Sequence, residues 1–310
     1  MSERFIPRGV ITAVLLPFDS ELRIDEGAYR SHLRDVAGVN GVSALTVNAH
    51  STETHALSFD EQKRVLDITL DEVGDKLPII CGVLAGGSLE GAALARQAEA
   101  AGAKCLLVLP STVFTKNAPH PPQVALNHFR VIADATNLSI IVFNYPIPGI
   151  GYSTDTLVQL AEQIPQIVAI KDLCGSPVLH ERNIRALHGL KRPLSVLTSH
   201  NSWLMSSLVL GGDGLLSGSG SVIADLQVEL WNAVKNKDLA RAQAVNDRIW
   251  PITEAFYADP GIDVVNRSKE ALVLLGRQKS AYVRPPLVKL SDMEISRIRQ
   301  ALVRGGLLKS

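Results

Sequence analysis

Short apolar runs alternate with longer amphipathic segments along most of the chain. A run of four to eight apolar residues between turn residues is typical of a buried strand, whereas apolar residues three and four apart are typical of a helix. On this basis we expect eight strands, at 9–16, 41–47, 78–83, 103–109, 139–144, 167–171, 193–199 and 214–217. The eighth is weak by itself and follows only from the rhythm of the others.

Helical segments fill the intervals, and some carry clear end signals. Ser58 and Glu61 have the spacing of a capping box, in which a hydroxyl and a carboxylate bind free N–H groups of the first turn. Beyond Ser221 the strand signal stops. We expect helices at 225–234, 239–258, 264–275 and 292–305.

Eight strand–helix units over about 220 residues fit one closed parallel barrel. An open, doubly wound sheet is the alternative, but the sequence has no glycine-rich nucleotide motif after the first strand and no G-x-x-x-x-G-K-[ST]. We therefore predict an α/β fold, a (β/α)8 TIM barrel over residues 1–223. A helical C-terminal subdomain, residues 224–310, is expected to pack on this barrel.

Composition narrows the function classes. Hydrophobic residues make up 46% of the 310 residues, as in folded globular proteins. Thirty-one basic residues balance 31 acidic ones, so nothing suggests nucleic acid or an anionic membrane as a partner. The N-terminus lacks an apolar signal region, and Cys81 and Cys105 lie in apolar runs as buried thiols would. We expect a cytoplasmic protein.

The sixth strand, Ile167-Val-Ala-Ile-Lys171, ends its apolar run in a lysine. Lysine is rarely buried without a partner, and burial lowers its pKa and leaves more free amine. A free amine attacks a ketone to form a Schiff base. The alternative is that Lys171 extends to solvent from the strand end and has no chemical role.

Polar residues gather at the carboxyl ends of the predicted strands, where the catalytic groups of such barrels lie. They are Asn48–Glu53, Phe143–Tyr145, Lys171, Asp172, Ser199–Asn201 and Ser217–Ser219. This set offers one amine, hydroxyls and amides. His50 and His55 lack the spacing of H-E-x-x-H, and no other cluster has metal-ligand spacing. We expect neither a metal nor an organic cofactor.

Several motifs in one frame resemble a known family. Ile167-Val-Ala-Ile-Lys171-Asp, Gly211-Gly-Asp-Gly-Leu-Leu-Ser217 and Arg284-Pro-Pro-Leu are similar to motifs of the dihydrodipicolinate synthase / N-acetylneuraminate lyase family, the pyruvate-dependent class I aldolases. The resemblance implies an imine between Lys171 and a small 2-keto acid. It also implies a homo-oligomer, a tetramer or a dimer.

The carboxylate loop departs from the family pattern. The family reads G-T-T-G-E or G-S-T-G-E where this chain has Ala49-His50-Ser51-Thr52-Glu53. The resemblance implies that Ser51 and Thr52 bind substrate, while His50 replaces a hydroxyl residue as a hydrogen-bond donor or an acid/base. Other substrate-binding candidates are Phe143, Ser199, His200, Leu216 and Ser217.

The motif that carries the family's proton-shuttle tyrosine also differs in this chain. The family reads Y-N-x-P, with the tyrosine beside the imine, and this chain has Phe143-Asn144-Tyr145-Pro146. Phenylalanine cannot transfer a proton. Tyr145 lies two residues on, so it would share the face of Phe143 in an extended chain. Tyr145 and His50 are the two candidates for the missing role.

Two further differences from the family motifs bear on which substrate the protein binds. No arginine follows the motif at 147–150, and Pro110-Ser111-Thr112 replaces a family tyrosine pair, so dihydrodipicolinate synthesis is not expected. The loop Ser199–Trp203 lacks the acidic residues of the sialic-acid lyases, so a long polyol is not supported.

Three functions remain open. The first is a Schiff-base lyase that cleaves a 2-keto acid to pyruvate and an aldehyde. The second is a dehydratase or deaminase of a 2-keto-3-deoxy acid, since the same imine serves both. The third is a keto-acid-binding protein without activity. Histidines 128, 180 and 188 lie in helical stretches, where we expect surface or capping positions.

Overall fold

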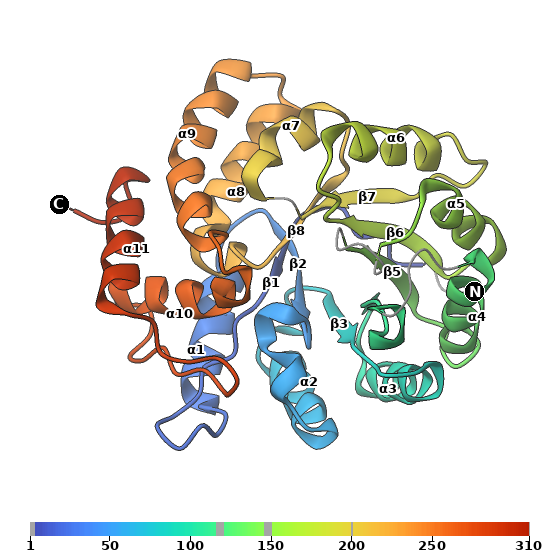
Figure 1. The fold of residues 1–310 in the computed structure, drawn as a ribbon, viewed down its shortest axis with the longest axis horizontal. Coiled ribbons are helices and arrows are strands. Elements are labelled where there is room, and N and C mark those ends of the chain that lie inside the picture. The colour runs from blue at the N-terminus through green and yellow to red at the C-terminus, as the bar shows by residue number, and fades with distance from the viewer. Residues whose placement is uncertain (1–3, 116–120, 146–150, 200, 310) are drawn as a thin grey trace.

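Eight parallel strands close into a barrel, each paired with the next and β8 with β1 (Figure 1). The computed structural model describes residues 4–115, 121–145, 151–199 and 201–309. The strands are β1 (Gly9–Ala13), β2 (Val42–Val47), β3 (Ile79–Val83), β4 (Cys105–Val108), β5 (Ser139–Asn144), β6 (Ile167–Asp172), β7 (Ser195–Thr198) and β8 (Gly214–Ser217). The predicted (β/α)8 TIM barrel is confirmed.

A helix follows each strand and covers the outside of the barrel (Figure 1). These helices are α1 (Glu26–Ala37), α2 (Phe59–Val73), α3 (Ser88–Ala101), α4 (Pro122–Ala133), α5 (Thr154–Gln163), α6 (Pro177–His188), α7 (Leu204–Val209) and α8 (Gly220–Lys235). The C-terminal helices are α9 (Leu239–Phe256), α10 (Val264–Leu274) and α11 (Asp292–Arg304). The subdomain boundary that we propose after residue 223 falls inside α8, at a kink at Ile223.

Apolar side chains on the two faces of the strands form two separate layers. One fills the barrel and includes Ile11, Ala44, Ile141, Ala169 and Leu216, and the other lies between strands and helices. Successive side chains of a strand point to opposite faces, so residue parity decides which layer a side chain enters. This rule places every other residue at a strand's carboxyl end inside the barrel mouth.

The first strand is shorter than predicted. The apolar run continues to Leu16, but ladder pairing ends at Ala13. The Leu15 amide donates to the Ser221 hydroxyl (3.1 Å) instead of to a strand. A side chain of α8 therefore replaces the sheet as hydrogen-bond partner, and hydrophobicity alone cannot reveal that exchange.

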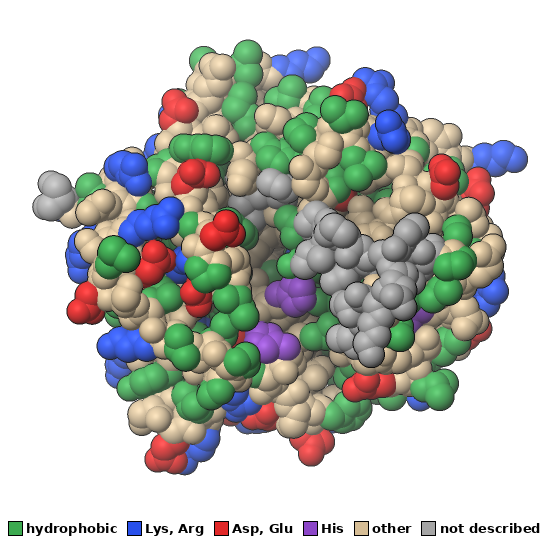
Figure 2. Space-filling model, in the orientation of Figure 1, with side chains coloured by type: hydrophobic (Ala, Val, Ile, Leu, Met, Phe, Trp, Pro, Cys, Tyr) green, Lys and Arg blue, Asp and Glu red, His purple; other side chains and the backbone are tan. Residues whose placement is uncertain are grey.

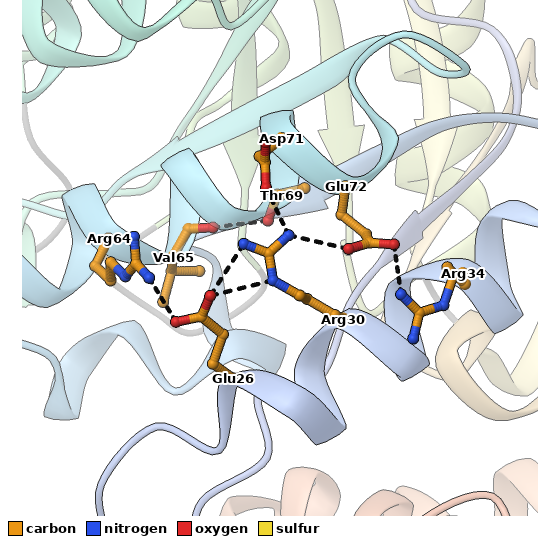
Figure 3. Close-up of polar contacts among 8 residues, drawn as sticks. All are labelled: Glu26, Arg30, Arg34, Arg64, Val65, Thr69, Asp71 and Glu72. Carbon is orange, nitrogen blue, oxygen red and sulfur yellow. Dashed lines mark hydrogen bonds and ion pairs between the residues drawn. The ribbon is translucent and has the colours of Figure 1, made fainter.

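Ion pairs join α1 to α2 on the outside of the barrel (Figure 3). Arg30 lies between Glu26 on its own helix and Asp71 and Glu72 on α2, with N–O distances of 3.0, 2.7 and 3.0 Å. The two helices also meet where the Tyr29 hydroxyl lies 2.7 Å from that of Thr69. Exposed pairs add little stability individually, so we assign this network a role in aligning the two helices.

The cysteine prediction is confirmed, since Cys81 and Cys105 are buried free thiols, as is Cys174. Within the described ranges, none of the helices combines the length and apolar character needed to cross a bilayer.

Candidate active site

Lys171 projects into the barrel from the carboxyl end of β6. It follows Ala169 on the inner face of that strand, and only 6% of its surface is exposed. Desolvation by burial lowers its pKa from 10.5 to about 7. A substantial fraction of the Lys171 side chains is therefore free amine at neutral pH, and a free amine is the form that attacks a carbonyl.

Phe143 is the partner of Lys171 in the ladder between β5 and β6. The Lys171 Nζ lies 4.1 Å from the centre of the Phe143 ring. The ring occupies space that water would otherwise fill, which keeps the amine desolvated. Its π face partly offsets this effect, because it attracts the ammonium form.

Tyr145 and His50 complete an aromatic group with Phe143 at the barrel mouth. The ring centres of Phe143 and Tyr145 are 5.2 Å apart, and that of His50 lies 5.7 Å from both. Figure 2 shows a hollow in this face of the molecule with histidine side chains at its edge. The structure thus brings together Lys171, which matches the family motif, and Phe143, Tyr145 and His50, which were named where the sequence departs from it.

Both polar rings of this group carry shifted pKa values. Desolvation raises the pKa of Tyr145 above 10, so the phenol is neutral at physiological pH. Desolvation and, after it, the Lys171 charge lower the pKa of His50. A neutral phenol can donate a proton, and a neutral imidazole can accept one.

The loop after β2 holds His50 and Ser51 over the barrel. Thr52 is fully buried, and its hydroxyl donates to the Val14 carbonyl on the β1 side (3.1 Å). This contact gives Thr52 a role in anchoring the loop. Ser51 rests against the end of β8, since a Cβ added at Gly218 would lie 2.3 Å from the Ser51 Oγ.

Glu53 is fixed by the C-terminal helices. Its carboxylate accepts hydrogen bonds from the Lys269 Nζ of α10 and from the Arg284 amide (3.2 Å). Glu53 and Lys269 are both fully buried. The Arg284 side chain binds Glu61 at the start of α2 through two bonds of 2.9 and 2.6 Å. The final glutamate of the loop motif and the Arg-Pro-Pro motif are therefore parts of one clamp.

Asp172 points away from the barrel interior, into a buried polar network behind the lysine strand. Its carboxylate accepts hydrogen bonds from Asn144 (3.0 Å), Asn183 (3.1 Å) and the Cys174 amide (3.2 Å). It also lies 2.8 Å from the His180 Nδ1. The network ties the ends of β5 and β6, and so the positions of Phe143 and Lys171, to α6.

The expectation of a surface or capping position is wrong for His180, because its side chain is fully buried between Asp172 and Ser207. The expectation of a surface position is wrong for His128 too, because that side chain is also buried. Asp172, Cys174 and His180 place three possible metal-ligand atoms within 4.8 Å of one another. Because these atoms already bond to one another, we interpret the cluster as a structural hydrogen-bonded group.

The eighth strand presents Leu216 to the barrel interior. Ser217 is one residue on and faces the outer layer, where its hydroxyl lies 2.8 Å from that of Ser219. Ser199 is buried at the end of β7, and His200 lies outside the described residues.

Thr46 is a candidate site residue that the sequence alone did not indicate. It shares the inner face of β2 with Ala44, and its hydroxyl has no partner among the described residues.

Comparison with known proteins agrees with this architecture. The dihydrodipicolinate synthetase family model matches residues 6–304. The chain is 32% identical over 305 residues to the 4-hydroxy-tetrahydrodipicolinate synthase of Methanopyrus kandleri, covering 97% of each chain. It is 29% identical over 306 residues to the enzyme of that name from Bartonella henselae, covering 97% of this chain and 99% of the relative.

Solved structures agree as well. YagE, a prophage protein of the same family from E. coli K12, crystallised with pyruvate, superposes with a TM-score of 0.90 at 25% identity. That match covers 97% of this chain and 99% of YagE. The Thermotoga maritima dihydrodipicolinate synthase gives a TM-score of 0.89 at 26% identity, covering 98% of this chain and all of that one. The chain belongs to the dihydrodipicolinate synthetase family, whose members are class I aldolase-type lyases.

Proposed function

We propose that this protein is a Schiff-base lyase that acts on a pyruvate-type 2-keto acid through Lys171. The observation that carries the proposal is a buried amine with a pKa of about 7, set into the barrel at the carboxyl end of β6. The Lys171 Nζ attacks the C2 carbonyl carbon, and the carbinolamine loses water to give an imine. The pyruvate complex of YagE, a family relative, supports this class of ligand.

The imine then accepts the electrons of the bond that breaks. A base removes the proton of the C4 hydroxyl, the C3–C4 bond breaks, and an aldehyde leaves. The electron pair moves through C3 to the imine nitrogen and gives an enamine. Protonation at C3 and hydrolysis then release pyruvate and regenerate the free amine. Tyr145 and His50 lie beside Phe143 at the barrel mouth and are our candidates for the proton transfers.

Binding of the keto-acid carboxylate is assigned to the loop after β2. Ser51 offers a hydroxyl at the end of β8, and neighbouring backbone N–H groups can join it. Thr46 precedes this loop, on the inner face of β2, and its hydroxyl has no partner among the described residues. Hydrogen-bond donors are sufficient here because Lys171 already supplies the positive charge of the imine.

We also propose that the reaction is not dihydrodipicolinate synthesis, although the curated relatives carry that name. The sequence has Phe143 in place of the family tyrosine and no arginine at 147–150. The residues at 146–150 lie outside the described ones, so this part of the proposal rests on sequence. Dehydration or deamination of a 2-keto-3-deoxy acid uses the same imine and remains the alternative.

A product assay separates these reactions. The protein is incubated with a set of 2-keto-3-deoxy acids, and pyruvate, water-loss and ammonia-loss products are identified by mass spectrometry. Pyruvate plus an aldehyde, absent with Lys171→Met, is the expected outcome. A dehydrated keto acid without pyruvate favours the alternative. Turnover that survives in Lys171→Met contradicts the proposal, and an assay for 4-hydroxy-tetrahydrodipicolinate formation tests the excluded activity.

A further inference from the structure

The C-terminal extension contains a cavity of about 360 Å³ that the proposed reaction does not use. It lies between α10, the segment that follows it, and α11, and every lining residue is described. The lining is formed by Glu270, Ser280, Ala281, Tyr282, Val283, Lys289 and Ile295. A cavity of this size accommodates a small organic molecule.

Glu270 is the unusual member of this lining. Only 8% of its surface is exposed, and within the described part of the chain its carboxylate makes no hydrogen bond or ion pair. Its charged neighbours on α10 are paired, since Arg267 binds Glu294 and Lys269 binds Glu53, and the Asn266 amide donates to the Val288 carbonyl. Neither carboxylate oxygen is among the fully buried unpartnered atoms of the described residues, so the carboxylate opens into the cavity, where a cationic group is its natural partner.

The remaining walls indicate the chemistry of that ligand. Tyr282 is 43% exposed and offers an aromatic face, while Val283 and Ile295 are apolar. Lys289 is exposed on the same lining, and its charge acts on Glu270 without an ion pair between them. The cavity thus presents one largely buried acid, one exposed cation and an apolar surface.

We propose that this cavity binds a small zwitterion, an amino-acid-like molecule. Its ammonium group pairs with Glu270, its carboxylate with Lys289, and its carbon skeleton lies against Tyr282, Val283 and Ile295. An amine next to an aromatic ring and a buried carboxylate gains both a charge-assisted hydrogen bond and a cation–π contact. The site is distinct from the barrel mouth. Tyr282 connects the cavity to the clamp around Glu53, since the Tyr282 carbonyl accepts a hydrogen bond from the Lys269 Nζ (2.8 Å).

Calorimetric titration of the full-length protein tests the proposal with three probes of matched length. 6-Aminohexanoate carries both charges, hexylamine only the cation, and hexanoate only the anion. We expect saturable binding of 6-aminohexanoate, weaker binding of hexylamine and none of hexanoate. No saturable binding of 6-aminohexanoate at millimolar concentration, or hexylamine binding as tightly as the zwitterion, overturns the proposal.

Two variants assign the contacts. Glu270→Gln keeps the size of the side chain and should weaken 6-aminohexanoate binding by about tenfold or more, the cost of one charge-assisted bond. Lys289→Met should weaken it by a smaller factor and leave hexylamine unaffected. Glu162→Gln, an exposed acid on α5, is the matched control and should bind like the parent. Unchanged affinity in Glu270→Gln, with the thermal midpoint of the unliganded variant preserved, overturns the assignment.

Discussion

The Lys171 Nζ lies 4.1 Å from the centre of the Phe143 ring, and the two residues are paired in the ladder between β5 and β6. The family motif has a hydroxyl at the position of Phe143, so this chain places an aromatic face against its amine instead. The amine is therefore desolvated, and our proposal assigns the proton transfers to other side chains, Tyr145 and His50.

The rate of imine formation should rise with pH around neutrality. Lys171 has a pKa of about 7, lowered by burial, and only the free amine attacks the keto acid. The amine fraction grows as the pH rises through this pKa, so borohydride trapping of pyruvate should accelerate from about pH 6 and level off above about pH 8. A rate that keeps rising to about pH 10 would mean an unperturbed lysine and contradict the assignment.

Phe143→Leu should lower that pKa further. Leucine keeps the site apolar but removes the π face that favours the ammonium, an effect of about 1 kcal/mol or somewhat less than one pKa unit. The midpoint of the trapping profile would move to lower pH. A midpoint displaced upward would contradict this prediction and show that leucine admits water, so that the lost desolvation outweighs the lost π attraction.

Tyr145→Phe should lower kcat by about a hundredfold or more while leaving imine trapping intact. The phenol is within an aromatic group at the barrel mouth, and loss of a positioned proton donor costs about this factor. His50→Gln is the companion variant, since a glutamine keeps a donor but cannot transfer protons. If neither variant lowers kcat, another group performs the transfer and our two candidates are both wrong.

Gly218→Ala should raise KM for the keto acid. A Cβ there would lie 2.3 Å from the Ser51 Oγ, so the Ser51 hydroxyl must leave its present position. Because Ser51 is assigned to the carboxylate, binding should weaken more than the chemical step. Gly261→Ala is the control, since a Cβ at Gly261 meets nothing within 4 Å. An unchanged KM in Gly218→Ala would remove Ser51 from the carboxylate site.

Lys269→Met should destabilise the fold by about 3–5 kcal/mol, because it leaves the buried Glu53 carboxylate without its cation. The double variant Glu53→Gln/Lys269→Met should recover a large part of this loss, measured by urea denaturation. Lys63→Met breaks an exposed helical pair and should change stability little. Equal destabilisation in the single and double variants would mean that the charge pair is not what holds the loop.

The barrel was predictable because strand rhythm and strand-end chemistry are local signals. The position of Lys171 follows from the same parity that buries Ala169, so one strand gives both the core and the candidate nucleophile. The clamp was not predictable from local pattern, since Glu53 and Lys269 are brought together only by the packing of α10. His180 shows the same limit, because a histidine on an amphipathic helix looks alike whether it meets solvent or a buried aspartate.

The most direct test of the account is reductive trapping. The protein is incubated with pyruvate, reduced with borohydride and mapped by peptide mass spectrometry, beside Lys171→Ala and the exposed-lysine control Lys63→Ala. We predict one reduced pyruvyl adduct, on the peptide that contains Lys171, in the parent and in Lys63→Ala but not in Lys171→Ala. No adduct from a folded parent protein, or an adduct that persists in Lys171→Ala, would contradict the central claim.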